Sequence, residues 1–523
     1  MKNPILIAVA VIIISKYSCG FEKLWSLSIT SSEYIDISSI DCNTTNNLVV
    51  TGCFMSKITF SNGLSFISNG SKDLFIAQYS LDGDIIWLRR EGGEGTDRVI
   101  KTFVLHDSSI LIFGEFDKKI IFQKKTSDSI ILTPKSGNSF FLVKYSDSGE
   151  LLFAKQILSS GDIHKVRINS LPNGDFAVSG TVGSVLDSGY INFTPNSKNP
   201  ISVYIKDRSE IFLSVYSSEG DLLWAKMIET PTKTSNAESL CMTVSDDSIY
   251  LTGEYRNHQK SVKKGNMTRH YFYNNTKPLT YKYSFTGSMA WKKELERPSN
   301  GAVIITIKYI PKDTLLVLSK YNGITYVSKY DGDGNLIWER SIKIESSNRQ
   351  EEQSIIHNKL DNSIIVRGIE TGIIKYNGTV IQTPSCDEKY FFILSFSEHG
   401  DIIQSDYYSN VVFSSYINDY IQIGGVMLFI PDGLVYTAGT LTFVKYKNTH
   451  ASYQEQRLAF VGKYRNMIPI KTEFYKPDSS PTMNAELHLP SMSTTVIFES
   501  PHPEHQKPDL ANEGKKDGKN ENH

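Results

Sequence analysis

The stretch that decides the fold is Asp73–Phe116, DLFIAQYSLDGDIIWLRREGGEGTDRVIKTFVLHDSSILIFGEF. It contains Tyr79, Gly83 and Trp87, each four residues apart, and this spacing returns along the chain. The further copies are Tyr145–Gly149–Phe153, Tyr216–Gly220–Trp224, Tyr283–Gly287–Trp291, Tyr330–Gly334–Trp338 and Phe396–Gly400–Gln404. Trp25 begins the series, so all five tryptophans occupy one repeat position. A repeat of this length, built from short β-like runs, predicts a propeller or a β-solenoid.

Four β-like runs within one repeat decide between these architectures. FIAQY and DIIWLRR are joined by the turn SLDG, where Gly83 supplies the positive φ that a tight hairpin needs. RVIKTFVLH and SILIFGEF follow and are joined by a short polar turn. Four strands that meet at tight turns form an antiparallel sheet, which is a propeller blade. The sequence therefore predicts an all-β fold, a seven-bladed β-propeller of four-stranded antiparallel blades.

The ends of the repeat array predict how the ring closes. Inner, second and third strands are each found seven times, but outer strands are found eight times, from 23–29 to 467–474. One terminal strand is therefore surplus. Trp25 fits the repeat position better than Pro469, so we expect Phe21–Ile29 to pair with the third strand 458–464. This velcro closure would join the two ends of the chain.

Several blocks resemble a known repeat family. DLFIAQYSLDGDIIWLRREGGEG and LVVTGCFMSKITF are similar to the bacterial-type seven-bladed β-propeller repeat, often called the SBBP repeat. Matching pieces are the Lys-Tyr of FLVKY (141–145), the LWA of 223–225 and the Thr-Gly steps at 51–52 and 252–253. The resemblance covers about residues 21–474 and weakens from Phe285 onward. It implies a propeller and an exported context, and it supplies no catalytic residues.

The two ends of the chain differ in composition from the repeats. The start, MKNPILIAVAVIIISKYSCGF, has a basic Lys2, a ten-residue apolar run and small residues before a cleavage point after Gly20. Residues 1–20 are therefore predicted to be a secretory signal peptide, too short to span a membrane. Lipid attachment at Cys19 is the alternative. Residues 475–523 are rich in Pro, Ser, Glu, Lys and Asn, which predicts a disordered polar tail.

Charge and cysteine content limit the kinds of partner. The formal net charge is −1, so no overall field favours nucleic acid. The cysteines that remain after cleavage are Cys42, Cys53, Cys241 and Cys386, which we expect to be buried thiols rather than disulfides. Sequons provide possible glycosylation sites at Asn43, Asn69, Asn192, Asn266, Asn274 and Asn377.

One segment departs from neutrality. Residues 254–278 carry Lys260, Lys263, Lys264 and Arg269 beside aromatic residues, with no acid after Glu254. A basic loop flanked by aromatic residues is suited to an anionic ligand. It is one of several long second–third connections, with 117–138, 182–209, 370–388 and 441–457, which antiparallel alternation places on one face. We expect binding on that face, because loops on a rigid scaffold carry function.

No motif in the chain assigns a reaction. The sequence has no Cys-x-x-Cys, His-Glu-x-x-His, Gly-x-Ser-x-Gly or phosphate loop, so we predict no catalytic, cofactor or metal residues. We expect a secreted, monomeric binding scaffold for a protein or glycan, with no transmembrane segment. The alternative is a propeller enzyme, a carbohydrate lyase or hydrolase with a site at the mouth of the central channel.

Overall fold

The computed structural model divides the chain into two units, Met1–Lys471 and Thr472–His523. It describes residues 21–466 except 124–127, 136–137, 184–188, 206–208, 229–234, 265–266, 296–302, 322, 346–352, 358–361, 372, 377–378, 383–388, 410–420, 430–433 and 447–452. The predicted signal peptide, the predicted tail and the surplus strand 467–474 lie outside the described residues. Every regular element within them is a β-strand.

Strands pair antiparallel in groups of four, and each group is called a blade below. The first three blades are β2 (Tyr34–Cys42), β3 (Leu48–Met55), β6 (Asp73–Tyr79) and β7 (Ile85–Gly93); β8 (Asp97–Val104), β9 (Ile110–Phe116), β12 (Asn138–Tyr145) and β13 (Leu151–Ser159); and β14 (Ile163–Ser170), β15 (Phe176–Gly183), β18 (Ser209–Tyr216) and β19 (Leu222–Ile228). These bounds agree with the four runs predicted for each repeat.

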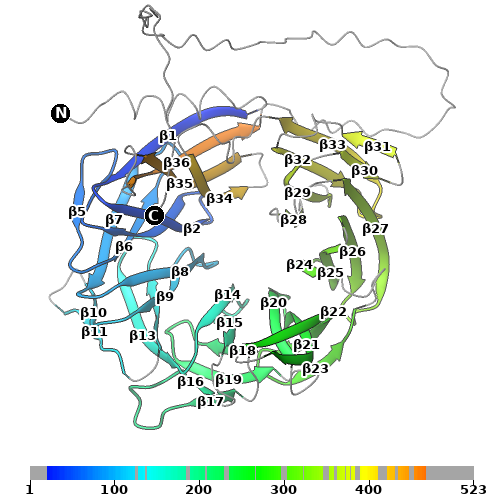
Figure 1. Ribbon diagram of the computed structural model, residues 1–523, viewed down its shortest axis with the longest axis horizontal. Coiled ribbons are helices and arrows are strands. Elements are labelled where there is room, and N and C mark those ends of the chain that lie inside the picture. The colour runs from blue at the N-terminus through cyan, green and yellow to red at the C-terminus, as the bar shows by residue number, and fades with distance from the viewer. Residues whose placement is uncertain are drawn as a thin grey trace, which may run out of the picture. The chain divides into compact units, whose positions relative to one another are not determined.

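The following three blades keep the same strand order. They are β20 (Ser235–Val244), β21 (Ser248–Lys264), β22 (Met267–Ser284) and β23 (Met289–Lys293); β24 (Val303–Ile310), β25 (Thr314–Tyr321), β26 (Ile324–Asp331) and β27 (Leu336–Glu345); and β28 (Gln353–His357), β29 (Ile364–Thr371), β32 (Lys389–Phe396) and β33 (Ile402–Ser409). Figure 1 shows the blades of this unit following one another around a common centre, an arrangement typical of a β-propeller.

A last blade combines strands from both ends of the described chain. β34 (Ile421–Phe429), β35 (Leu434–Tyr446) and β36 (Tyr453–Asn466) pair in order, and β1 (Phe21–Ser31) is the fourth strand. β1 runs antiparallel to β36 from Phe21 opposite Asn466 to Thr30 opposite Leu458. This is the strand pairing that the repeat position of Trp25 predicted.

Short hairpins extend four of the sheets beyond their outer strands. These rim hairpins are β4 (Lys57–Thr59) with β5 (Ser65–Ile67), β10 (Ile120–Phe122) with β11 (Ile130–Leu132), β16 (Gly189–Asn192) with β17 (Ser202–Ile205), and β30 (Ile373–Tyr376) with β31 (Thr379–Gln382). Each pairs with the outer strand of the preceding blade, as β10 does with β7. Figure 1 places them at the periphery.

The rim hairpins correct part of the sequence interpretation. Segments 117–138, 182–209 and 370–388 were expected to be loops on one face, but each contains a hairpin that pairs with a neighbouring sheet. The physical reason is that an unpaired outer strand exposes backbone N–H and C=O groups, and the hairpin satisfies them. The outer strands β19, β23 and β33 have no such partner among the described residues.

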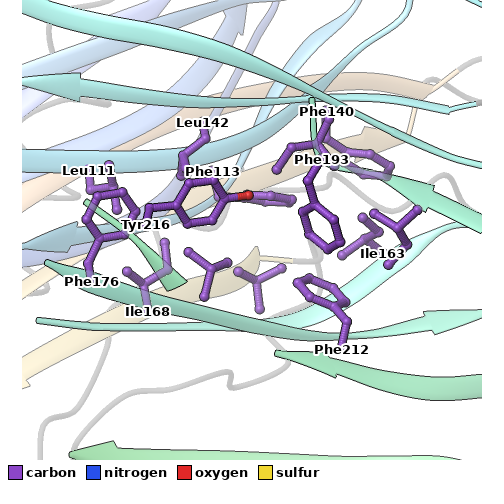
Figure 2. Packing of buried hydrophobic residues seen from close by; sticks show 14 of the residues in the cluster. Leu111, Phe113, Phe140, Leu142, Ile163, Ile168, Phe176, Phe193, Phe212 and Tyr216 are labelled. Carbon is purple, nitrogen blue, oxygen red and sulfur yellow. The ribbon is translucent and has the colours of Figure 1, made fainter. Parts of the chain in front are cut away.

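The core lies between successive blades rather than within one sheet. Figure 2 shows Phe113 and Phe140 of the second blade facing Phe176, Phe212 and Tyr216 of the third. The Phe176 and Tyr216 rings are stacked at 5.3 Å. Equivalent clusters join the first blade to the second and the third to the fourth. Burial of both faces of each sheet explains why the third strand β6 is buried at every position.

The strand register also bears on the cysteines. Cys42 lies opposite Leu48 and Cys53 lies opposite Asp36, so these two cysteines are not cross-strand partners. Cys53 and Cys241 are buried. Cys386 lies outside the described residues.

Candidate functional site

The repeated tryptophans connect neighbouring blades. Each indole Nε1–H donates to a backbone carbonyl in the Gly turn of the next blade, as Trp87 does to Asp147 at 2.9 Å and Trp224 to Phe285 at 2.7 Å. Trp25, Trp291 and Trp338 make the same bond at 2.8, 3.3 and 3.0 Å. These rings therefore pack between neighbouring blades.

The Gly turns are shaped to receive these rings. Gly149 has φ +79°, and a Cβ placed there would lie 2.8 Å from the Trp87 ring. Gly400 has φ +85°, and its Cβ would lie 3.0 Å from the Trp338 ring. Glycine is needed at these turns for the backbone conformation and also for the close approach of the indole.

A cation two residues after the tryptophan strengthens the same contact. Arg340 Nε donates to the Gly400 carbonyl at 2.9 Å, and Arg89 Nη1 donates to the Gly149 carbonyl at 2.8 Å. Lys226 and Lys293 make the corresponding bonds to Gly287 and Asp333. This basic position was not predicted from the sequence, although the recurrent Trp-x-Lys/Arg spacing indicates it.

A second basic position lies on the third strand, just before the repeat tyrosine. The Lys144 side chain is 3% exposed, and its Nζ donates to the Ser218 carbonyl in the next blade at 3.1 Å. Lys329 Nζ lies 3.6 Å from the Glu398 carboxylate and 3.4 Å from its carbonyl. The face that carries the Gly turns, called the Gly-turn face below, is therefore occupied by contacts between blades.

The predicted anionic-ligand segment lies in a long hairpin rather than a loop. Lys260 is opposite Tyr271, Lys263 is opposite Thr268, and Lys264 is opposite Met267. Arg269 is opposite Val262 in the same ladder. The structure thus brings all four predicted basic residues into the two paired strands β21 and β22. Segment 441–457 is similar, because β35 and β36 pair as far as Tyr446 opposite Tyr453.

The six sequons fall in different environments. Asn43 is 4% exposed, and its side chain donates to Asp147 Oδ1 while accepting from the Asn47 amide. Asn69 is exposed in the connection after β5, and its Oδ1 accepts from Arg90. Asn192 ends β16, and Asn274 lies in β22. Asn266 and Asn377 lie outside the described residues.

Among the described residues, no group of three or more His, Cys, Asp and Glu side chains is arranged to hold a metal ion. The same part of the chain contains no helix long and apolar enough to cross a membrane.

Comparisons with known proteins give distant similarities. No family model matches the chain. An uncharacterised WD repeat-containing protein of Acanthamoeba polyphaga mimivirus is 20% identical over 264 residues, which is 45% of this chain and 19% of that protein. The chain therefore matches less than a fifth of the length of this relative.

Similar solved structures include a WD40 domain and a lyase. The WD40 domain of Toxoplasma gondii coronin is 9% identical, with a TM-score of 0.37 over 87% of this chain and 88% of that one. Virginiamycin B lyase from Staphylococcus aureus is 11% identical, with a TM-score of 0.36 over 84% of this chain and 99% of that one. Together with the WD repeat relative, the strand pairing defines an all-β, propeller-like repeat protein.

Proposed function

We propose that this chain is an exported, non-catalytic binding scaffold built as a closed seven-bladed propeller of the SBBP type. The pairing of β1 with β36 supports ring closure, because it gives the last blade its fourth strand from the opposite end of the chain. Export rests on the predicted signal peptide at 1–20. Mass spectrometry of the secreted protein tests this step, with Phe21 expected as its first residue.

The observation that carries the binding function is the difference between the two sets of turns. The Gly turns are short, and their carbonyls are bonded to Trp, Arg and Lys side chains of the neighbouring blade. The connections at the opposite strand ends vary from a short rim hairpin to the long β21–β22 hairpin. Variation on a fixed scaffold is typical of a binding surface.

The β21–β22 hairpin is the best candidate for the ligand contact. It continues beyond Glu254, which lies opposite Pro278, to the end of the ladder at Lys264 and Met267. Between Glu254 and Pro278 the sequence contains six Lys and Arg residues and no Asp or Glu. Such a segment favours an anionic partner, either an acidic glycan or an acidic protein surface.

Binding to immobilised heparin and polygalacturonate, at 50 and 200 mM NaCl, tests the proposal. Both probes should bind more weakly at the higher salt, because screening shortens the range of charge interactions. Changing Lys260, Lys263, Lys264 and Arg269 together to Gln should weaken binding at least about tenfold, which corresponds to about 1.4 kcal/mol.

A matched control removes the same number of cations from other exposed positions. Lys57, Lys118, Lys119 and Lys198 are exposed, and their combined change to Gln should leave binding unchanged. Equal loss in both variants would show only a general charge effect. Shortening of either polysaccharide during incubation would contradict the non-catalytic function.

A further inference from the structure

Two buried carboxylates lie where the first blade meets the second. Asp73 begins β6 and Asp97 begins β8, and both side chains are fully buried. Asp73 Oδ2 accepts from the Asn69 amide at 3.0 Å, and Asp97 Oδ2 accepts from the Gly93 amide at 2.8 Å. Figure 1 shows β6, β7 and β8 adjacent in this part of the molecule.

Each carboxylate has a second oxygen with no hydrogen-bond partner. Asp73 Oδ1 and Asp97 Oδ1 are both buried and unbonded. A buried polar atom without a partner costs roughly 1–3 kcal/mol, and more when the group is charged. Two such atoms at one junction indicate that a group able to satisfy carboxylate oxygens belongs there.

The electrostatics point to a positive group. Asp73 has Arg90 Nη1 at 3.6 Å. In the described part of the chain, no Lys or Arg side chain forms an ion pair with Asp97.

The backbone around the carboxylates approaches them closely. A Cβ on Gly92 would lie 2.4 Å from the Asp73 carboxyl carbon, and a Cβ on Gly95 would lie 2.0 Å from Asp117 Oδ1. A Cβ on Gly70 would lie 2.6 Å from both the Gly93 and the Glu94 carbonyl oxygens. The glycines therefore allow carboxylates and carbonyl oxygens to gather at this junction.

The pair is not a general feature of the repeat. Asp73 lies six residues before Tyr79; the residue six before Tyr145 is Ser139, and the residue six before Tyr216 is the buried Glu210, so only the pairing with a second carboxylate can be specific. At the second junction the residue equivalent to Asp97 is Ile163, because β14 ends at Ser170 as β8 ends at Val104. The carboxylate pair therefore serves a purpose specific to the first junction, beyond the packing that all blades share.

From these observations we infer that Asp73 and Asp97 bind a hard divalent cation of the calcium type. Oxygen-only ligands and an irregular turn suit Ca²⁺, which takes six to eight oxygens in flexible geometry. The two carboxylates provide the charge, and water completes the coordination. A two-carboxylate site is consistent with the absence of a three-residue metal cluster among the described residues.

Calcium titration of the full mature chain tests this site. After treatment with EDTA and dialysis, calorimetry with CaCl₂ should give one ion per chain, and 1 mM CaCl₂ should raise the melting temperature. Asp97→Asn and Asp73→Asn should each weaken binding at least about tenfold and remove the thermal shift. MgCl₂ should bind more weakly, because it demands stricter octahedral geometry.

Asp82→Asn is the matched control, because Asp82 is exposed in a Gly turn of the first blade and its change removes the same charge. It should bind calcium as the wild type does.

The two site variants are compared with the wild type in EDTA by urea denaturation. Neither substitution by Asn should lower the free energy of unfolding, since each removes like-charge repulsion. Absence of calcium binding by the wild type, or unchanged affinity in both site variants, would overturn the inference.

Discussion

The indole Nε1–H of Trp87 donates to the carbonyl of Asp147, 60 residues later, across the junction between the first and second blades. The same turn contains Gly149, whose carbonyl accepts from Arg89 at 2.8 Å. β7 thus contacts the next blade through the Trp87 ring, its indole N–H and the Arg89 guanidinium. The arrangement recurs at Trp338, Arg340 and Gly400. Stability of the array therefore depends on contacts between blades.

Gly149→Ala should destabilise the protein more than Gly174→Ala. Both glycines have positive φ, +79° and +89°, so both substitutions strain the backbone by about 1 kcal/mol. Only at Gly149 would the added Cβ meet a neighbour, the Trp87 ring at 2.8 Å, whereas Gly174 has nothing within 4 Å. We expect an additional cost of about 1–3 kcal/mol for Gly149→Ala, measured by urea denaturation. Equal losses would mean that the indole does not constrain the turn.

Arg340→Ala should lower the free energy of unfolding by about 2–3 kcal/mol. The side chain donates to the Gly400 carbonyl at 2.9 Å and to the His399 carbonyl at 3.0 Å, and it lies over the Trp338 ring. Arg340→Lys should recover part of this loss, because lysine makes the equivalent bond at Lys226 and Lys293.

The control for Arg340 is Arg98, which pairs with Glu115 at 2.9 Å while both side chains are largely exposed. Arg98→Ala should cost less than about 1 kcal/mol, as exposed ion pairs usually do. A similar loss in the Arg98 and Arg340 variants would contradict a specific role for the guanidinium between blades.

Much of the fold follows from the Tyr-Gly-Trp spacing. Gly83 and its equivalents predicted the turns, and the alternating runs on either side predicted the strands, because both signals are local in sequence. The rim hairpins were missed because Ile120–Phe122 and Ser202–Ile205 are only three or four residues long. Such short strands form only because the outer strand of another blade supplies the hydrogen bonds.

The candidate sites show a similar limit. Lys260 and Arg269 were recognised from composition, but that they lie in paired strands depends on the length of the β21–β22 ladder. Asp73 and Asp97 were not identified, because 24 residues separate them in sequence and nothing local indicates that both are buried. Burial of a charge at a junction is a tertiary property, and a single repeat does not contain it.

The stability of the first junction should depend on pH through Asp41. Its carboxylate accepts from the Val104 amide at 2.8 Å and from the Cys42 amide at 2.9 Å. Burial raises its pKa despite these two bonds and the charge of Lys101. An acid whose folded pKa exceeds its unfolded value, about 3.9, contributes stability below that value and loses it as pH rises through the folded pKa.

Asp41→Asn keeps an acceptor for Val104 but removes the titration. The stability of the variant relative to the wild type should therefore increase as pH rises from about 4 to 7, in urea denaturation at each pH. Asp84→Asn, at an exposed position in the first Gly turn, is the control and should show no such trend. A constant difference between the Asp41 variant and the wild type would contradict this assignment.

The pairing of β1 with β36 should be essential, whereas the tail should not be. Ser26 lies opposite Gly462 in this ladder, within the Cα separation that a disulfide can bridge. Ser26→Cys with Gly462→Cys should cross-link on oxidation and stabilise the protein by about 2–4 kcal/mol. Ser26→Cys with Arg457→Cys should not cross-link, because Arg457 lies five residues before Gly462 in β36.

A chain that starts at Ser32 loses both β1 and the Trp25 bond to Leu81, so it should unfold at much lower urea concentration. A chain that ends at Tyr475 should keep the wild-type midpoint, and a midpoint lowered as far as in the β1 deletion would show that residues 476–523 contribute to the fold.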